Sequence, residues 1–180
     1  MMVRHKVGLR TSRIMIACAL LVSTSCKRAD RDPGRTYDRK GRFSLKAPQG
    51  FEVQYQLGKI AVNLLGDKSK DSPLRPHIAI ELQRKSGRID LDRFVKASEH
   101  TLPRLFSDFK LHEKSAAVVG GRRAFRWVIS YRDGQLRLKN AIYAVARGRR
   151  LALITCGAPL ARFDAHLPVC KAAVDSFRFE

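Results

Sequence analysis

Cysteine and histidine are the residue types of this 180-residue chain that most often do chemistry, and their spacing limits what they can do. The cysteines form no CxxC motif and the histidines are scattered, so the sequence predicts no zinc site. The chain contains no GxSxG, HExxH or phosphate-loop motif. Asp90 and Asp92 could pass for a carboxylate pair, but they begin a helical pattern, where acidic residues cap the helix. We therefore expect no catalytic residue, no metal and no cofactor.

The N-terminal segment, residues 1–25, has the layout of a secretory signal peptide. Four Lys or Arg residues and no acid precede a charge-free run of twelve residues, 14–25. A membrane-spanning helix needs roughly 20 apolar residues, whereas ~10–14 suit the apolar core of an export signal. A buried core helix, the alternative, would explain neither the basic lead nor the small residues that end the run.

The end of this run, Thr24, Ser25 and Cys26, resembles the cleavage site of a bacterial lipoprotein, in which small residues precede the cysteine that receives lipid. The resemblance implies that residues 1–25 are removed and that Cys26 is acylated. More than one acyl chain gives stable anchoring, at roughly 0.8 kcal/mol per buried methylene. We therefore expect a protein of the bacterial cell envelope, held on a membrane by its N-terminal lipid and facing the periplasm or the exterior. Cleavage nearby by an ordinary signal peptidase is the alternative.

Two cysteines remain, because Cys18 leaves with the signal and Cys26 carries lipid. Cys156 and Cys170 would then lie in an oxidising compartment, where disulfides persist, and the sequence predicts a bond between them. Closing a loop of about 15 residues stabilises a protein by about 3 kcal/mol in the chain-entropy model. The alternative is two unpaired thiols that pack as small apolar side chains.

The charge of the chain is the other strong signal. The full chain carries +20, and removal of residues 1–25 takes away four positive charges and no acid, which leaves +16. An exported protein rarely meets nucleic acid, so we expect no nucleic-acid partner. Anionic lipid, acidic polysaccharide or an acidic envelope protein are the expected partners. The alternative is that an Arg-rich composition only solvates the surface.

The chain after the signal divides into a short tether and one domain. Residues 26–39 mix both charges with proline and glycine and are expected to be a flexible tether for the lipid anchor. Residues 40–180 are expected to form one α+β domain. Their first strands are marked by alternating apolar residues, and a helix with Asp90 as N-cap follows over 90–109. The expected first strands are 42–48, 51–57, 59–66 and 77–85.

Four further strands follow the helix, and short links that contain glycine join them. Such links are typical of hairpins, so the strands are expected to pair in sequence as an antiparallel meander. The last helix is expected to begin at Pro168, before a short strand against the sheet edge. The four expected strands are 111–119, 123–131, 137–146 and 150–156.

The first and third links of this meander carry five arginines. Alternate links of a meander fall at the same end of the sheet, so these arginines are expected to share one rim. Arginine makes forked contacts with phosphate and carboxylate, which makes the rim a candidate surface for an anionic partner. The alternative is that arginines at hairpin tips simply stay in water. The expected rim consists of Arg122, Arg123, Arg147, Arg149 and Arg150.

The segments "FSLKAPQGF", "LDRFVKASEHTL", "VVGGRRAFRWVISY" and "AVDSFRF" resemble the PsbP-like superfamily, and within it the bacterial DcrB-like lipoproteins. The resemblance covers residues 40–180 and rests on packing and turn residues. It implies an antiparallel sheet flanked by helices, a PsbP-like α/β/α sandwich, and a non-enzymatic binding or assembly role. We expect a monomer. The alternative is a small exported hydrolase or carbohydrate-active enzyme whose site the sequence does not mark.

Overall fold

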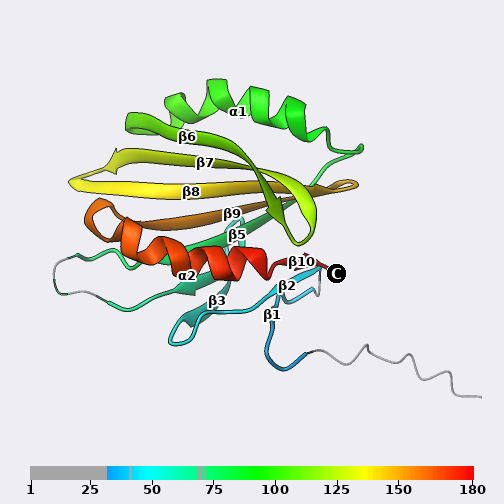
Figure 1. Cartoon of the computed structure of the whole chain (residues 1–180), viewed down its shortest axis with the longest axis horizontal. Helices are drawn as coiled ribbons and strands as arrows, with labels where there is room; N and C mark the ends of the chain where they lie inside the picture. The colour runs from blue at the N-terminus through cyan, green and yellow to red at the C-terminus, as the bar shows by residue number, and fades with distance from the viewer. Residues whose placement is uncertain (1–31, 41, 69, 71) are drawn as a thin grey trace, which may run out of the picture. The chain divides into compact units, whose positions relative to one another are not determined.

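The main element of the structure is a seven-stranded antiparallel sheet. The computed structural model describes residues 32–180 apart from positions 41, 69 and 71, so the expected signal peptide and Cys26 lie outside the described residues. The strands follow the order β3-β4-β5-β9-β8-β7-β6 (Figure 1). Their bounds are β3 (Glu52–Leu57), β4 (Ile60–Leu65), β5 (His77–Arg84), β6 (Ser107–Val119), β7 (Arg122–Asp133), β8 (Leu136–Arg147) and β9 (Arg150–Pro159).

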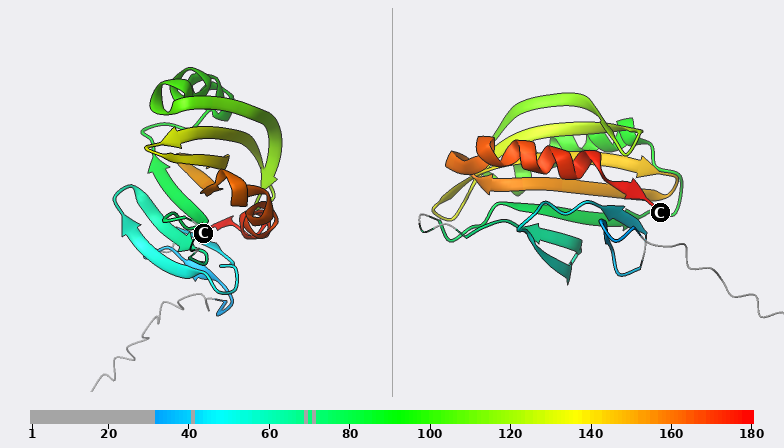
Figure 2. Two further views of the ribbon diagram at one scale, coloured as in Figure 1. Left: turned by 90° about the vertical axis from the view of Figure 1, so that its left-hand side faces the viewer. Right: turned by 60° about the horizontal axis from the view of Figure 1, so that its bottom comes forward.

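Two helices cover opposite faces of this sheet, as Figure 2 shows from the side. Helix α1 (Leu91–Leu105) packs with Trp127, Ile129 and Ala144 on one face, and α2 (Phe163–Asp175) packs on the other. Successive side chains of a strand point to opposite faces, so each central strand supplies both cores. The α+β class and the consecutive pairing of β6 to β9 are therefore as the sequence predicts.

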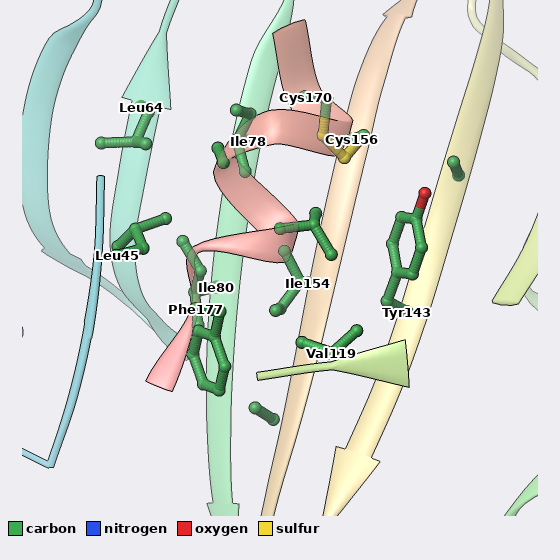
Figure 3. Close-up of a cluster of buried hydrophobic side chains, with 14 of the residues drawn as sticks. Leu45, Leu64, Ile78, Ile80, Val119, Tyr143, Ile154, Cys156, Cys170 and Phe177 are labelled. Atoms are coloured by element: carbon green, nitrogen blue, oxygen red, sulfur yellow. A yellow bond between two sulfur atoms is a disulfide. The ribbon is translucent and has the colours of Figure 1, made fainter. Parts of the chain in front are cut away.

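A second, three-stranded sheet joins the two ends of the described chain. Its order is β1 (Thr36–Tyr37), β2 (Phe43–Leu45) and β10 (Arg178–Phe179). The ring of Phe43 lies 5.4 Å from that of Phe177, which follows α2, and both side chains are almost completely buried. The segment before β10 is thus packed into the core beneath α2, as Figure 3 shows for Phe177.

The start of the folded unit corrects the expected domain boundary. Strand β1 lies within the expected tether, 26–39, yet it pairs with β2, and Asp38 is only 1 % exposed. The compact unit runs from Asp32 to Glu180 and so begins before residue 40. A strand of two residues is too short to show a period in the sequence, which is why residues 36–39 read as tether.

The two helices also differ from their expected bounds. Helix α1 ends at Leu105 instead of residue 109, because Phe106 is extended and residues from Ser107 onward belong to β6. Phe106 still packs beside the α1 core, with its ring 4.3 Å from that of Tyr131. Helix α2 begins at Phe163, directly after the short 3-10 helix η1 (Leu160–Arg162), so Pro168 lies inside it. Phe163 and His166, both buried, hold the turn before Pro168 against the sheet.

Candidate functional site

The two links that carry the expected rim lie at the same end of the sheet. The register pairs Val119 with Arg122 and Arg147 with Arg150, which closes the β6–β7 and β8–β9 hairpins at that end. The side chains nevertheless point to both faces. Arg123 lies on the α1 side, where its two terminal nitrogens donate to Asp92 at 2.9 and 2.6 Å. The five arginines therefore share an end of the sheet but do not form one surface.

Two of these arginines are anchored on the α2 side by main-chain oxygens. Arg147 donates to the carbonyl oxygen of Phe179 at 2.8 Å. Arg150 donates to the main-chain oxygens of Arg42 and Glu180, both at 3.0 Å. The guanidinium of Arg150 also lies over the ring of Phe179, 5.5 Å from its centroid. These contacts fix the direction of both side chains.

The anchored Arg150 forms part of a pocket of about 540 Å³ that is lined mainly by cations. We call it the arginine pocket; it consists of Lys40, Arg42, Arg84, Arg149 and Arg150 around Leu82. Its members come from the loop before β2, the end of β5 and the β8–β9 link, and Arg84 pairs in register with Arg150. Sequence reasoning missed Lys40, Arg42 and Arg84, because only the pairing of distant segments brings them together.

Positive charge in the arginine pocket exceeds the negative charge near it. Burial lowers the pKa of Arg150 from its usual value, and the charges of Arg147, Arg42 and Arg84 lower the pKa further. Asp38 raises it in part, but this carboxylate is already paired with Arg42, at 2.8 Å between Oδ2 and Nη2. Arg150 stays charged at neutral pH, so the pocket is a fixed positive site, offset only in part by Asp38, that suits an anion.

The disulfide between Cys156 and Cys170 is present, as the sequence predicts (Figure 3). The two Cα atoms lie 6.0 Å apart, inside the usual range of about 4.4–6.8 Å. Both cysteines are completely buried, and the bond joins β9 to α2.

Asp90 and Asp92, which could pass for a carboxylate pair in the sequence, each have a partner in the structure. The side chain of Asp90 accepts a hydrogen bond from the backbone N–H of Arg93 at 3.0 Å, and Asp92 is the partner of Arg123, so both acids have structural roles. Residues 32–180, with their three gaps, contain no group of three or more His, Cys, Asp or Glu placed to hold a metal ion. No helix in this part of the chain has the length and apolar character needed to cross a membrane.

Two histidines, the partly buried His77 and the buried His166, make the stability of the fold depend on pH. Burial lowers the pKa of each below the usual 6.5, although a hydrogen bond to a backbone carbonyl raises it in part. The unfolded chain therefore binds more protons than the folded protein just below pH 6.5, and folding stability must fall as the pH falls. We expect a lower urea midpoint at pH 5.5 than at pH 7.5.

Substituting these histidines should flatten that profile. We expect His77→Gln and His166→Gln to narrow the difference between the two midpoints. Replacing the exposed His100 on α1 with Gln is the matched control and should leave the difference unchanged. Equal profiles for all three variants would show that other groups govern the pH dependence.

The architecture described above, an antiparallel sheet between two helices, is the PsbP-like α+β fold. No protein-family model matches the chain, and no curated protein sequence does. Similar solved structures include that of LpqN, a protein described as involved in cell envelope biogenesis of Mycobacterium tuberculosis. The TM-score is 0.65 and the identity 17 %, and the match covers 82 % of this chain and 86 % of LpqN. The cyanobacterial PsbP of Synechocystis, CyanoP, is also similar (TM-score 0.55, 13 % identity, 81 % and 91 %). So is the Ran-binding protein Mog1p of Saccharomyces cerevisiae (TM-score 0.58, 13 % identity, 81 % and 94 %). At these identities the similarity shows the fold.

Proposed function

We propose that the protein is a non-enzymatic docking module of the bacterial cell envelope, tethered through lipid on Cys26, and that it binds an anionic partner in the arginine pocket. The observation that carries this proposal is Arg150, held by main-chain oxygens among arginines whose charge the nearby Asp38 offsets only in part. The described involvement of LpqN in cell envelope biogenesis and the Ran-binding role of Mog1p agree with such a function.

The arginine pocket is suited to binding because its central side chains are already ordered. Immobilising a long side chain costs about 0.5–1.5 kcal/mol on association. Because Arg150 and Arg149 are already held in place in the free protein, binding immobilises them at a lower cost. Arg149 donates to the main-chain oxygen of Lys85 at 3.1 Å. A guanidinium has five N–H donors, so both arginines keep donors for phosphate or carboxylate oxygens. Arg84 and Lys40 are exposed beside them and add charge at the mouth.

Binding to phosphatidylglycerol vesicles tests this surface with a defined anionic probe. The protein used begins at residue 27, which removes Cys26 and any acyl contribution but keeps the whole compact unit. We expect the double variant Arg84→Ser/Arg149→Ser to bind more weakly in a co-sedimentation assay. At about 1 kcal/mol for each basic residue at an anionic surface, the loss is roughly 30-fold at low salt. It should shrink as salt is raised, because salt screens exposed charges.

The control variant removes the same charge elsewhere. Arg104→Ser/Arg137→Ser changes two exposed arginines outside the arginine pocket, on α1 and at the start of β8. We expect it to bind several-fold more tightly than Arg84→Ser/Arg149→Ser. Equal losses in the two variants would mean that net charge alone drives binding, which would contradict the arginine pocket as the docking site.

A further inference from the structure

Three arginines lie in one row across the large sheet beside the arginine pocket. The register places Arg84 on β5 opposite Arg150 on β9, and Arg150 opposite Arg147 on β8. Residues directly opposite each other in an antiparallel pair lie on the same face, where like charges destabilise the sheet. The charges of Arg84 and Arg147 accordingly lower the pKa of Arg150. The row is therefore unfavourable in the free protein, and an anion bound beside it would relieve the repulsion.

The acids near this row are too few to balance it. Asp38 pairs with Arg42 at 2.8 Å. Glu180 lies beside Arg150, whose Nη2 donates to its main-chain oxygen, and the side-chain carboxylate of Glu180 accepts from the hydroxyl of Ser44. Of the described residues that line the arginine pocket, five are cations and none is an acid. The pocket keeps an excess of positive charge even when both nearby acids are counted against it.

The cations of the arginine pocket come from two walls. Arg84, Arg149 and Arg150 belong to the large sheet and its β8–β9 link, whereas Lys40 and Arg42 precede β2. The walls meet where Arg150 Nη1 donates to the main-chain oxygen of Arg42 at 3.0 Å. The volume, about 540 Å³, lies within the range of small-molecule sites, about 300–1,000 Å³. Two linked anionic groups, one for each wall, match this arrangement.

The hydrogen-bond donors of the arginine pocket favour phosphate. Arg150 uses one N–H of each terminal nitrogen for main-chain oxygens, and Arg149 uses Nε for Lys85, so other N–H groups of both remain for forked contacts. A phosphate group offers three acceptor oxygens and a charge of about −1.5 to −2 at pH 7. A carboxylate offers two oxygens and a single charge. Two linked phosphates therefore bring the most charge and the most acceptors into a small volume.

We propose that the arginine pocket binds a diphosphate group, with one phosphate against each wall. This inference rests on the proposed function, since it names the anionic group that the arginine pocket takes. The contacts described above involve only the phosphates, so the group can belong to a free molecule or to a lipid.

Calorimetric titration with inorganic pyrophosphate, in magnesium-free buffer, tests the proposal on the protein that begins at residue 27. We expect pyrophosphate to bind about tenfold more tightly than orthophosphate, because the second phosphate adds charge-assisted hydrogen bonds. Citrate has a similar charge, but its carboxylates are spread over a carbon skeleton, so it should also bind about tenfold more weakly than pyrophosphate. Equal affinity for pyrophosphate and orthophosphate, or for pyrophosphate and citrate, would overturn the proposal.

Substitutions on the two walls show whether pyrophosphate binds in the arginine pocket. Arg84→Gln and Lys40→Gln each remove one exposed cation, and each should weaken pyrophosphate binding by about tenfold. Arg104→Gln changes an exposed arginine of α1 outside the pocket and should bind as the parent does. Circular dichroism verifies that the variants are folded. Undiminished affinity in either folded wall variant, or an equal loss in Arg104→Gln, would overturn the proposal.

Vesicles separate the two sources of the diphosphate group. Phosphatidylcholine vesicles that carry farnesyl diphosphate are compared with vesicles that carry farnesyl phosphate in a co-sedimentation assay. Retention by the first, about tenfold stronger than by the second, shows that the pocket takes a lipid-borne diphosphate. Pyrophosphate binding without retention shows that it takes a free one.

Failure of this inference can be told from failure of the proposed function. If Arg84→Ser/Arg149→Ser loses phosphatidylglycerol binding while pyrophosphate binds no more tightly than orthophosphate, the docking site stands and the diphosphate is wrong. If that variant and Arg104→Ser/Arg137→Ser lose vesicle binding equally while pyrophosphate binds tightly and depends on Arg84 and Lys40, the docking role is wrong and the diphosphate site stands.

Discussion

Replacing both Cys156 and Cys170 with alanine is expected to lower the free energy of unfolding by about 3 kcal/mol. The bond closes a loop of about 15 residues, so its loss gives the unfolded chain more freedom. It also ties α2 to β9 at a place where both cysteines are completely buried. Denaturant unfolding of the parent and the double variant, without reductant, measures the difference.

The single variant Cys156→Ala separates the bond from the packing of its sulfur atoms. It breaks the disulfide but keeps the Cys170 side chain, so most of the loss should already appear in it. Adding reductant should move the parent toward the single variant and leave the double variant where it is. Alkylation of both thiols in the native parent without reductant would contradict the bond itself.

The parts of the fold that the sequence predicts are those with local signals. Strands β6 to β9 are long, alternate clearly and are separated by glycine turns, and Gly134 and Gly148 adopt the positive φ of 58° and 60° that such turns favour. Strand β2 lies within the strand predicted over 42–48, and β10 is the predicted short last strand, but their pairing with each other and with β1 joins distant segments. No local period reveals pairing of that kind, which is why the sequence pattern assigns Asp38 to the tether.

The candidate site was predictable in one respect and not in another. The meander rule places the β6–β7 and β8–β9 links at one end of the sheet, but it does not assign faces. Arg122 and Arg123 are neighbours in a strand and must point to opposite faces, which the sequence already implies. The joining of Arg42 and Arg84 to Arg150 depends on the small sheet and on the β5–β9 register.

Replacing Asp38 with alanine is also expected to cost about 3 kcal/mol, near the lower end of the range for breaking a buried ion pair. Asp38 is 1 % exposed, and its carboxylate accepts from Arg42 Nε at 2.8 Å and from the backbone N–H of Phe43 at 3.3 Å. Alanine leaves these donors without an acceptor just before β2, whose Phe43 and Leu45 are completely buried. Arg42 is 35 % exposed and can recover some hydration, which limits the loss. Urea unfolding at neutral pH measures it.

Two comparisons show whether this loss comes from burial of the carboxylate. Asp175→Ala breaks another pair four residues apart, with Lys171, in which both side chains are at least half exposed. Because water already screens this pair, its loss should change the urea midpoint far less than the loss of Asp38. Asp38→Asn keeps one acceptor oxygen for the backbone N–H groups but removes the charge, so it should fall between the parent and Asp38→Ala. If Asp38→Ala cost no more than Asp175→Ala, the buried carboxylate would not be what holds β1 and β2 to the domain, and the boundary of the stable fold would lie nearer residue 40.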